Sequence, residues 1–219
     1  MSFAEQLGEP VEYPLVKGIA GYPKIIEVKK LEHERVAFGG IWHTDTAYLE
    51  RPPMASMLLA REVPPAGGDT LFANMYLAFE SLSPAFQDLL KNLKGVNSST
   101  KADASKTRED RIKSDGSGKS DFVAEHPVVR THPETGRKAL YVNSGHTVRF
   151  AGWTEEESAP LLNYLFDFQV RPEFTCRFSW RPGSIALWDN RCAQHNPVND
   201  YHGHRRVMHR ITLAGDQPR

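Results

Sequence analysis

The sequence predicts a mainly β protein built as an antiparallel sandwich or barrel. Most of its apolar residues fall in short segments that are separated by turn residues, and only two segments show helical periodicity. The apolar run at 57–63, for example, is ended by Pro64-Pro65 and by the turn at 66–69. Many short strands with few helices are typical of sandwiches and barrels.

Further strands follow this run along the chain. Extended structure is expected to resume directly after the turn, at 70–73. The remaining segments with strand character are 128–130, 139–142, 175–180, 184–188 and 206–214. Because we find no internal repeat in the 219 residues, we expect a single domain over residues 1–219.

The two predicted helices have clear starts. Ser83-Pro84 supplies the N-cap and first position of a helix that runs to about residue 93, with one apolar face (Phe86, Leu89, Leu90 and Leu93). A second helix begins at Thr154, because Glu157 three residues later completes a capping box. Its side chains expected to face the core are Leu161, Leu162, Leu165 and Phe166.

Residues 97–121 contain almost no apolar side chains, so they cannot bury enough surface to order themselves. We interpret them as a flexible loop. Loops of this length inside compact domains are also often active-site lids, and the sequence leaves both interpretations open.

The charge balance limits the partners. Lysine plus arginine and aspartate plus glutamate both number 27, so the chain has no general positive field to hold nucleic acid or a membrane surface. No apolar stretch reaches the ~18 residues that a membrane helix needs. The first residues also lack the basic-then-apolar pattern of a signal peptide. We therefore expect a cytoplasmic protein whose two cysteines, Cys176 and Cys192, are free thiols.

Three residues match a 2-His-1-carboxylate facial triad for Fe(II): His43, Asp45 and His195. His43 and Asp45 stand two apart, so in an extended segment both side chains point to the same face. His195 is expected on a loop after the strand 184–188. The same ligands with a water would also make a catalytic zinc site. Cys192 is a weaker candidate, because such an Fe(II) site prefers nitrogen and oxygen donors.

Five other histidines are expected to be structural or solvated. His202 and His204 flank a glycine in a polar loop, and His33 lies in a charged stretch. His126 and His132 bracket a turn-bounded strand edge.

Arg206 and Arg210 share one face of the predicted strand at 206–214. On alternation alone, arginines that face away from apolar packing usually face solvent. If they face the site instead, a separation of roughly 13 Å is too long for both to clamp one carboxylate. They could then hold two different anions, because each guanidinium binds a carboxylate or sulfonate bidentately. Such a pair would weigh against zinc.

With these residues the chain resembles the taurine dioxygenase family of Fe(II)/2-oxoglutarate-dependent oxygenases, which also includes alkylsulfatase and phenoxyacetate-degrading relatives. The resemblance spans about residues 40–217 in consistent order and is specific to that family. Its motifs are WHTD at 42–45, PPAGGDTL at 64–71, HPVVRTHP at 126–133, PEF at 172–174, WDNRCAQH at 188–195 and RRVMHR at 205–210.

The resemblance implies a double-stranded β-helix, which is a jelly roll with a few flanking helices. The open mouth of the jelly roll would hold the iron between His43, Asp45 and His195. It assigns Thr70 and Arg206 to 2-oxoglutarate, with Arg206 on the distal carboxylate. Arg210 would face the acidic group of the primary substrate. The implied reaction uses O₂, hydroxylates a small anionic organic substrate (a sulfonate, an alkyl sulfate or a carboxylate), and releases succinate and CO₂.

The chain departs from the family pattern in places. The iron motif begins at residue 43, earlier than in family members, so early strands and part of the substrate wall are expected to be missing. Gly39 stands where the taurine enzyme has a substrate-binding asparagine, and His146 stands where it has an aromatic side chain near the substrate. We therefore expect a substrate other than taurine, with His146 as a candidate contact. An aspartate at position 45, rather than glycine or alanine, also argues against halogenation.

Two other functions stay open. One is a catalytically impaired jelly-roll module that keeps the metal but cannot close its site, and the other is a zinc hydrolase. The sequence also leaves the oligomeric state open, a homo-oligomer included.

Overall fold

The computed structural model describes residues 1–14, 16–37, 39–101 and 122–219. In chain order its elements are α1 (Ser2–Glu5), β1 (Pro10–Val11), β2 (Ile25–Lys30), β3 (Ala55–Glu62), β4 (Thr70–Asn74), α2 (Met75–Glu80), α3 (Pro84–Leu90), β5 (Lys94–Ser98), β6 (Val123–Pro127), β7 (Val129–Thr131), β8 (Lys138–Leu140), β9 (Thr147–Phe150), α4 (Glu155–Phe168), η3 (Pro172–Phe174), β10 (Thr175–Phe178), β11 (Ile185–Asp189), β12 (Ala193–Pro197) and β13 (Arg206–Leu213).

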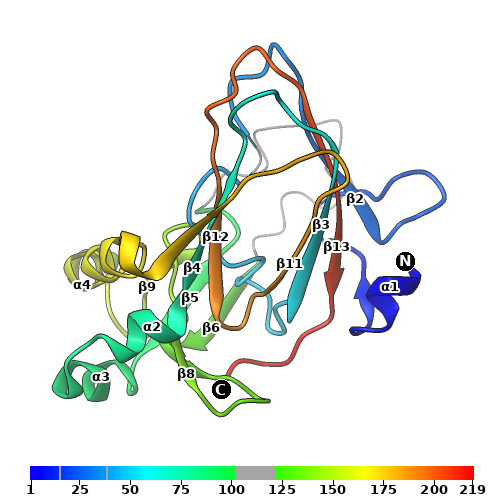
Figure 1. The fold of residues 1–219 in the computed structure, drawn as a ribbon. Coiled ribbons are helices and arrows are strands. Elements are labelled where there is room, and N and C mark those ends of the chain that lie inside the picture. Colours follow the sequence, from blue (N-terminus) through cyan, green and yellow to red (C-terminus); the bar gives the residue numbers. More distant parts are fainter. Residues whose placement is uncertain (15, 38, 102–121) are drawn as a thin grey trace.

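Two antiparallel sheets form the predicted sandwich. In the larger sheet, β13 pairs on one side with β3, which pairs in turn with β11. On its other side β13 pairs with β1 and β2. In the smaller sheet, β4 lies between β10 and β12. Figure 1 shows the strands of both sheets running along the same long direction of the molecule.

Apolar side chains from both sheets meet between them. The larger sheet contributes Leu58, Trp188 and Met208, and Phe72 and Phe178 of the smaller sheet pack against this cluster. Each of these residues faces inward because side chains alternate between the two faces of a strand. The mainly β antiparallel sandwich predicted from the sequence is confirmed.

The arginines of β13 face the inside of the sandwich. Arg206 and Arg210 lie on the same face as the fully buried Met208, and both are buried. The prediction from alternation alone, that these two arginines face solvent, is therefore wrong. This face of β13 presents both polar and apolar side chains to the interior of the sandwich.

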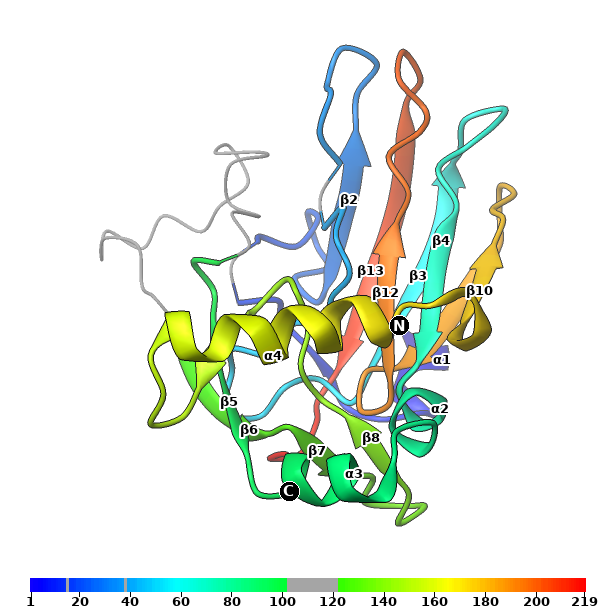
Figure 2. The ribbon, with the colours of Figure 1, turned by 90° about the vertical axis from the view of Figure 1, so that its left-hand side faces the viewer.

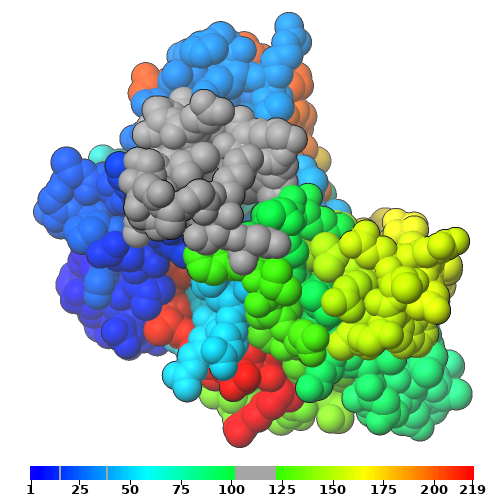
Figure 3. Space-filling view, turned by 180° about the vertical axis from the view of Figure 1, so that it is seen from behind, coloured from blue at the N-terminus to red at the C-terminus, as the bar shows by residue number. Residues whose placement is uncertain are grey.

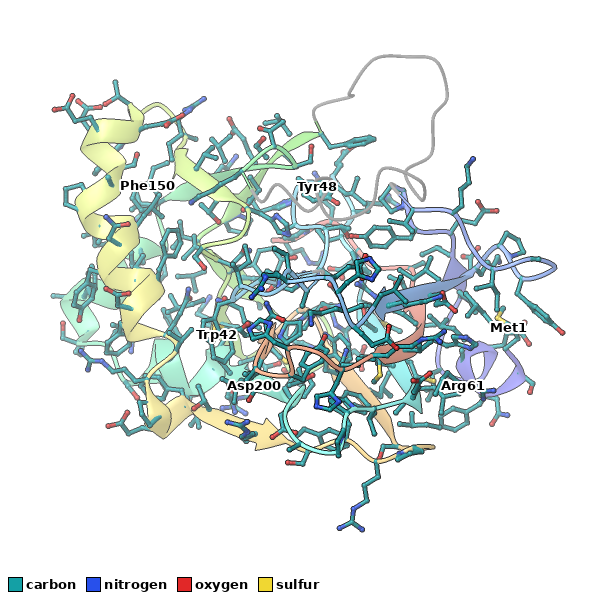
Figure 4. The ribbon with its side chains drawn as sticks, turned by 90° about the horizontal axis from the view of Figure 1, so that it is seen from above. Met1, Trp42, Tyr48, Arg61, Phe150 and Asp200 are labelled. Atoms are coloured by element: carbon teal, nitrogen blue, oxygen red, sulfur yellow. The ribbon has the colours of Figure 1, made fainter. Side chains whose placement is uncertain are left out.

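A second core lies between the helices and the remaining strands. The small sheets β6–β5–β9 and β7–β8 pack with α2, α3 and α4 around buried residues such as Phe150, which Figure 4 labels beside α4. In Figure 2, α4 crosses in front of the strands. It starts with the predicted capping box between Thr154 and Glu157. No helix of the described chain is both long and apolar enough for a membrane span.

Several predicted boundaries are wrong. The first predicted helix starts at Pro84 but ends at Leu90, and Leu89 is exposed rather than core-facing. His195 lies within β12, not on a loop. The predicted loop 97–121 starts too early, because its first two residues end β5 and are buried. Residues 102–121 of that loop, and with them the lid interpretation, lie outside the described residues.

The C-terminal residues pack back onto the molecule. The backbone N–H of Thr131 donates to the Arg219 carbonyl, and the buried Arg130 binds Asp216 through Nη2 at 2.6 Å. Figure 3 shows this end of the chain (red) at the base of the molecule, between segments coloured cyan and green.

Three connections meet at one end of the sandwich. They join β2 to His43, β3 to β4, and β12 to β13, and Figure 1 shows all three at the upper end. In the view from above, Asp200 marks the last of them (Figure 4). Gly39 of the first connection and Tyr201 of the last both line the cavity of the candidate site.

Candidate metal centre

His43, Asp45 and His195 converge on one point of the interior. Nε2 of His43 lies 3.5 Å from Oδ1 of Asp45, and Nε2 of His195 lies 3.8 Å from the same oxygen. The three donor atoms lie within 4.8 Å of one another, and all three residues are buried. Residues far apart in the sequence therefore present two nitrogens and one carboxylate oxygen to one place.

A short backbone bridge brings the two histidines together. The His43 N–H donates to the His195 carbonyl at 3.0 Å, and the His195 N–H donates to the His43 carbonyl at 2.9 Å. His43 thereby pairs with His195 of β12 as an isolated antiparallel bridge. The chain then turns at Asp45 and Thr46, whose φ of 42° lies in the left-handed region. This turn directs the Asp45 carboxylate toward the larger sheet.

A hydrogen bond to His43 and the burial of His195 suit the two histidines to metal binding. Nδ1 of His43 lies 2.8 Å from the Ile41 carbonyl, which accepts its proton and leaves the Nε2 lone pair for a metal. Burial, reinforced by His43, lowers the pKa of His195 well below its usual range, so its imidazole is neutral.

The Asp45 carboxylate is ionised although it is buried. Burial raises its pKa, but the opposing effects, foremost that of the adjacent Arg210 guanidinium, outweigh burial and leave the net pKa well below the usual range. The imidazole nitrogens of His43 and His195, together with this carboxylate, fit a divalent first-row ion such as Fe(II).

The second oxygen of Asp45 is held by the protein itself. Ser56 Oγ donates to Oδ2 at 2.6 Å, and Nη2 of Arg210 contacts the same oxygen at 2.8 Å. Asn190 Nδ2 in turn donates to Ser56 Oγ, and Trp188 Nε1 donates to Asn190 Oδ1. This buried chain fixes Oδ2 and leaves Oδ1 directed at the histidines.

A cavity beside the triad contains the predicted 2-oxoglutarate residues. Thr70 and Arg206 line it together with His43 and His195. Trp180 Nε1 donates to Thr70 Oγ1 at 3.0 Å and so fixes that hydroxyl. Nε and Nη2 of Arg206 have no hydrogen-bond partner in the described part of the chain. A buried guanidinium with free donors is suited to bind an anion.

The two predicted substrate residues differ in their placement. Arg210 lines the same cavity but already contacts Asp45, a partner that the sequence did not indicate. The His146 ring lies 6.0 Å from the His43 ring and 5.0 Å from the Tyr48 ring, centroid to centroid, and His146 does not line this cavity. Burial lowers the pKa of His146 to about 3, so it is neutral. The substrate contacts of both residues stay predictions.

A second cluster, of His132, Asp189 and Cys192, is a structural network. Nδ1 of His132 accepts from two backbone N–H groups, so its Nε2 carries the proton that it donates to Asp189 at 3.0 Å. Arg191 binds the same carboxylate through Nε and Nη2. Because these donors already satisfy the atoms a metal would need, the cluster fits no cation, and Cys192 belongs to it rather than to the triad.

Sequence reasoning missed three residues around the site: Lys30, Ser56 and Asn190. Lys30 continues the inward-facing alternation of Ile26 and Val28 on β2, and Ser56 lies at the start of an apolar strand. Asn190 lies within the WDNRCAQH motif. Their positions were visible in the sequence, but their partners depend on pairing between distant strands.

An antiparallel sandwich that brings two histidines and one aspartate together in its interior has the fold and the donor set that are typical of mononuclear non-haem metal sites. The chain belongs to the taurine catabolism dioxygenase TauD/TfdA family, whose model matches residues 1–212. It is an enzyme of the alpha-ketoglutarate-dependent dioxygenase class.

Similar proteins span nearly the whole chain. An alkylsulfatase of Acinetobacter baylyi is 37% identical, over 98% of this chain and 68% of its own length. An alpha-ketoglutarate-dependent sulfate ester dioxygenase of Pseudomonas putida is 35% identical, over 99% and 72%. The crystal structure of a taurine dioxygenase from Burkholderia xenovorans superposes with a TM-score of 0.79 at 35% identity, over 99% of this chain and 71% of that one. The predicted jelly-roll fold is thus confirmed.

Proposed function

We propose that this protein is an Fe(II)- and 2-oxoglutarate-dependent dioxygenase that hydroxylates a small anionic organic substrate, foremost an alkyl sulfate ester. The observation that carries the proposal is the shared cavity, which is lined by two triad histidines and by Arg206, whose Nε and Nη2 have no hydrogen-bond partner among the described residues. A 2-oxo acid has a chelating end for the metal and an anionic end for the arginine.

Each part of the site has a separate task. Nε2 of His43, Oδ1 of Asp45 and Nε2 of His195 would hold Fe(II), which supplies the activation of O₂ and the oxidation of a C–H bond when it is bound. Arg206 and Thr70 would bind and orient the distal carboxylate of 2-oxoglutarate. The overall reaction converts 2-oxoglutarate, O₂ and the substrate into succinate, CO₂ and a hydroxylated product.

The protein's own contribution is orientation and exclusion of water. The triad is buried, so the metal would be exposed to solvent mainly through the cavity. A neutral His195 and an ionised Asp45 would already be in the forms that bind the metal, so neither of these two ligands need lose a proton at neutral pH.

Three observations support a sulfate ester as substrate. Arg210 lines the cavity, and its Nε has no hydrogen-bond partner among the described residues. The Nε edge of its guanidinium is therefore available to a sulfate. Gly39 has a φ of +71°, and a Cβ there would lie 3.1 Å from His43 Cε1, so this position disfavours the asparagine of the taurine type. Both similar curated proteins named above also act on sulfate esters by their names. Hydroxylation of the carbon that bears the ester oxygen gives an adduct that breaks into an aldehyde and sulfate.

The test is a matched panel of hexyl sulfate, hexanesulfonate and hexanoate, which share an alkyl chain and differ in the head group. Succinate release from 2-oxoglutarate is measured with Fe(II), ascorbate and air, together with inorganic sulfate. We expect coupled turnover with hexyl sulfate and loss of turnover in His43→Ala. Arg206→Met should weaken 2-oxoglutarate binding about 100-fold, since it removes a charged hydrogen-bonded pair.

Two other outcomes would replace the proposal. Binding of 2-oxoglutarate without any succinate, coupled or uncoupled, would identify a catalytically impaired metal-binding module. Zinc as the metal recovered from anaerobically purified protein, with hydrolysis in the absence of O₂, would identify a hydrolase.

A further inference from the structure

Lys30, at the end of β2, is a buried cation that the proposed function has not used. Its residue exposure is 3%, and lysine is rarely so buried without a partner. Its Nζ has no hydrogen-bond partner among the described residues. The Nζ atom lies over the face of the Tyr201 ring, 4.4 Å from the ring centroid. The aromatic face steadies the ammonium without neutralising its charge.

Lys30 lies directly across from Arg206. The two are Cα partners in the antiparallel pairing of β2 with β13, so their side chains project from the same face of the sheet. Both line the cavity that also contains Thr70 and Tyr201. One cavity wall therefore presents two buried cations side by side.

The nearby acidic groups are engaged elsewhere. Asp69 accepts from Nε of Arg177 at 2.6 Å, and Asp200 accepts from the Gly68 N–H at 2.7 Å. Within the described ranges, neither Lys30 nor Arg206 forms an ion pair with a carboxylate of the protein. Two adjacent buried cations repel each other and lose hydration, so this arrangement is favourable only when an anion binds between them.

We propose that Lys30 is a second anchor for the distal carboxylate of the 2-oxo acid, acting with Arg206 and Thr70, and that this pair of cations selects a dicarboxylate over a monocarboxylate 2-oxo acid. The inference rests on the proposed function and adds a specificity residue to it. Arg206 offers a planar fork to one carboxylate, whereas Lys30 offers a compact charge that can approach the same group from the neighbouring strand.

The experiment measures binding rather than turnover. Mn(II)-loaded protein is titrated calorimetrically without O₂ with 2-oxoglutarate and with 2-oxovalerate, which has the same carbon chain but a methyl group in place of the distal carboxylate. Lys30→Met should weaken 2-oxoglutarate binding ten- to a hundredfold and change 2-oxovalerate binding less than threefold. Lys30→Arg should restore part of the preference.

Two controls separate this role from a structural one. Lys91→Met removes a charge at the end of α3, where Nζ pairs with Asp88 at 2.8 Å and the residue does not line the cavity, and it should leave both affinities unchanged. Lys30→Met should also melt at a higher temperature than wild type without ligand, because it removes an unpaired buried charge. A residue needed only for folding would lower the melting temperature.

The outcomes are distinguishable. If wild type binds 2-oxoglutarate and Lys30→Met binds it equally well, the role of Lys30 is overturned and the proposed function stands. Equal loss of both ligands in Lys30→Met, with a lower melting temperature, would also overturn it. Wild-type protein that bound neither ligand would overturn the inference and the proposed function together.

Discussion

At the residue scale, Asp45 has two oxygens with different tasks. Oδ1 faces the two histidines, while Oδ2 is occupied by Ser56 and Arg210. A carboxylate held in this way can offer one oxygen to a metal without rotating. Its orientation depends on Ser56, because a hydroxyl donor at 2.6 Å fixes the plane of the carboxylate.

Ser56→Ala should therefore weaken metal binding by about tenfold, the lower end of what loss of a supporting hydrogen bond costs a metal site. Asn190 would also lose the acceptor for its Nδ2. The measurement is an anaerobic Mn(II) or Fe(II) titration. Ser184→Ala, which removes a hydroxyl that accepts from the Arg181 N–H far from the triad, is the control. An unchanged metal affinity in Ser56→Ala would show that Arg210 alone suffices to orient Asp45.

The residue types at the site were readable from the sequence, but their partners were not. His43, Asp45 and His195 could be selected by type, spacing and motif, and the structure brings them together. Lys30 and Ser56 could not be selected. Strand alternation assigns a residue to a face but does not show which residue stands opposite it, and that depends on the register of β13 against β2 and β3.

At the element scale, the turn between β3 and β4 shapes the cavity. Gly67 and Gly68 both have φ above +70°, a region that other residues rarely adopt. A Cβ at Gly68 would lie 3.2 Å from both Arg206 Cδ and Tyr201 Cδ1. The turn thus lets the backbone approach the side chains of Arg206 and Tyr201, which both line the cavity.

Gly68→Ala should weaken 2-oxoglutarate binding several-fold and destabilise the fold by about 1–2 kcal/mol, since it adds backbone strain and a close contact. Gly136→Ala is the matched control: its φ is +70°, and a Cβ there would meet nothing within 4 Å. That variant should show the backbone penalty in urea unfolding and keep its 2-oxoglutarate affinity. A loss of affinity equal in both variants would mean that strain alone is responsible.

Prediction of the elements succeeded where local chemistry decides. The capping box of α4 and Ser83-Pro84 before α3 fix their helix starts without help from the rest of the chain. It failed for β12, which reads AQHNP and has no apolar alternation. This strand exists because its backbone pairs with β4, because His195 turns toward the site and because Gln194 donates to the Val142 carbonyl, which are all long-range effects.

At the scale of the whole molecule, the interior contains several neutral histidines. His126, His146 and His195 are buried, and burial lowers the pKa of each below the usual 6.5. Each imidazole is held neutral by desolvation in the folded protein and becomes free to protonate when the chain unfolds. Folding is therefore linked to pH through residues from β6, β12 and the segment before β9.

The metal-free protein should lose stability as the pH falls below about 6.5. In that range the unfolded chain binds protons at these histidines that the folded chain does not bind, so unfolding takes up protons and acid favours it. Urea unfolding in EDTA between pH 8 and pH 5 measures the slope of the unfolding free energy against pH.

His126→Gln keeps a donor for the Leu49 carbonyl but cannot titrate, and it should reduce this slope by up to about 1.4 kcal/mol per pH unit, the contribution of one proton. The exposed His204, changed to Gln, serves as the control. A stability that stayed level or rose from pH 7.5 to pH 5.5 would show that the buried histidines are protonated in the folded protein, which would also contradict a neutral His195 ready to bind the metal.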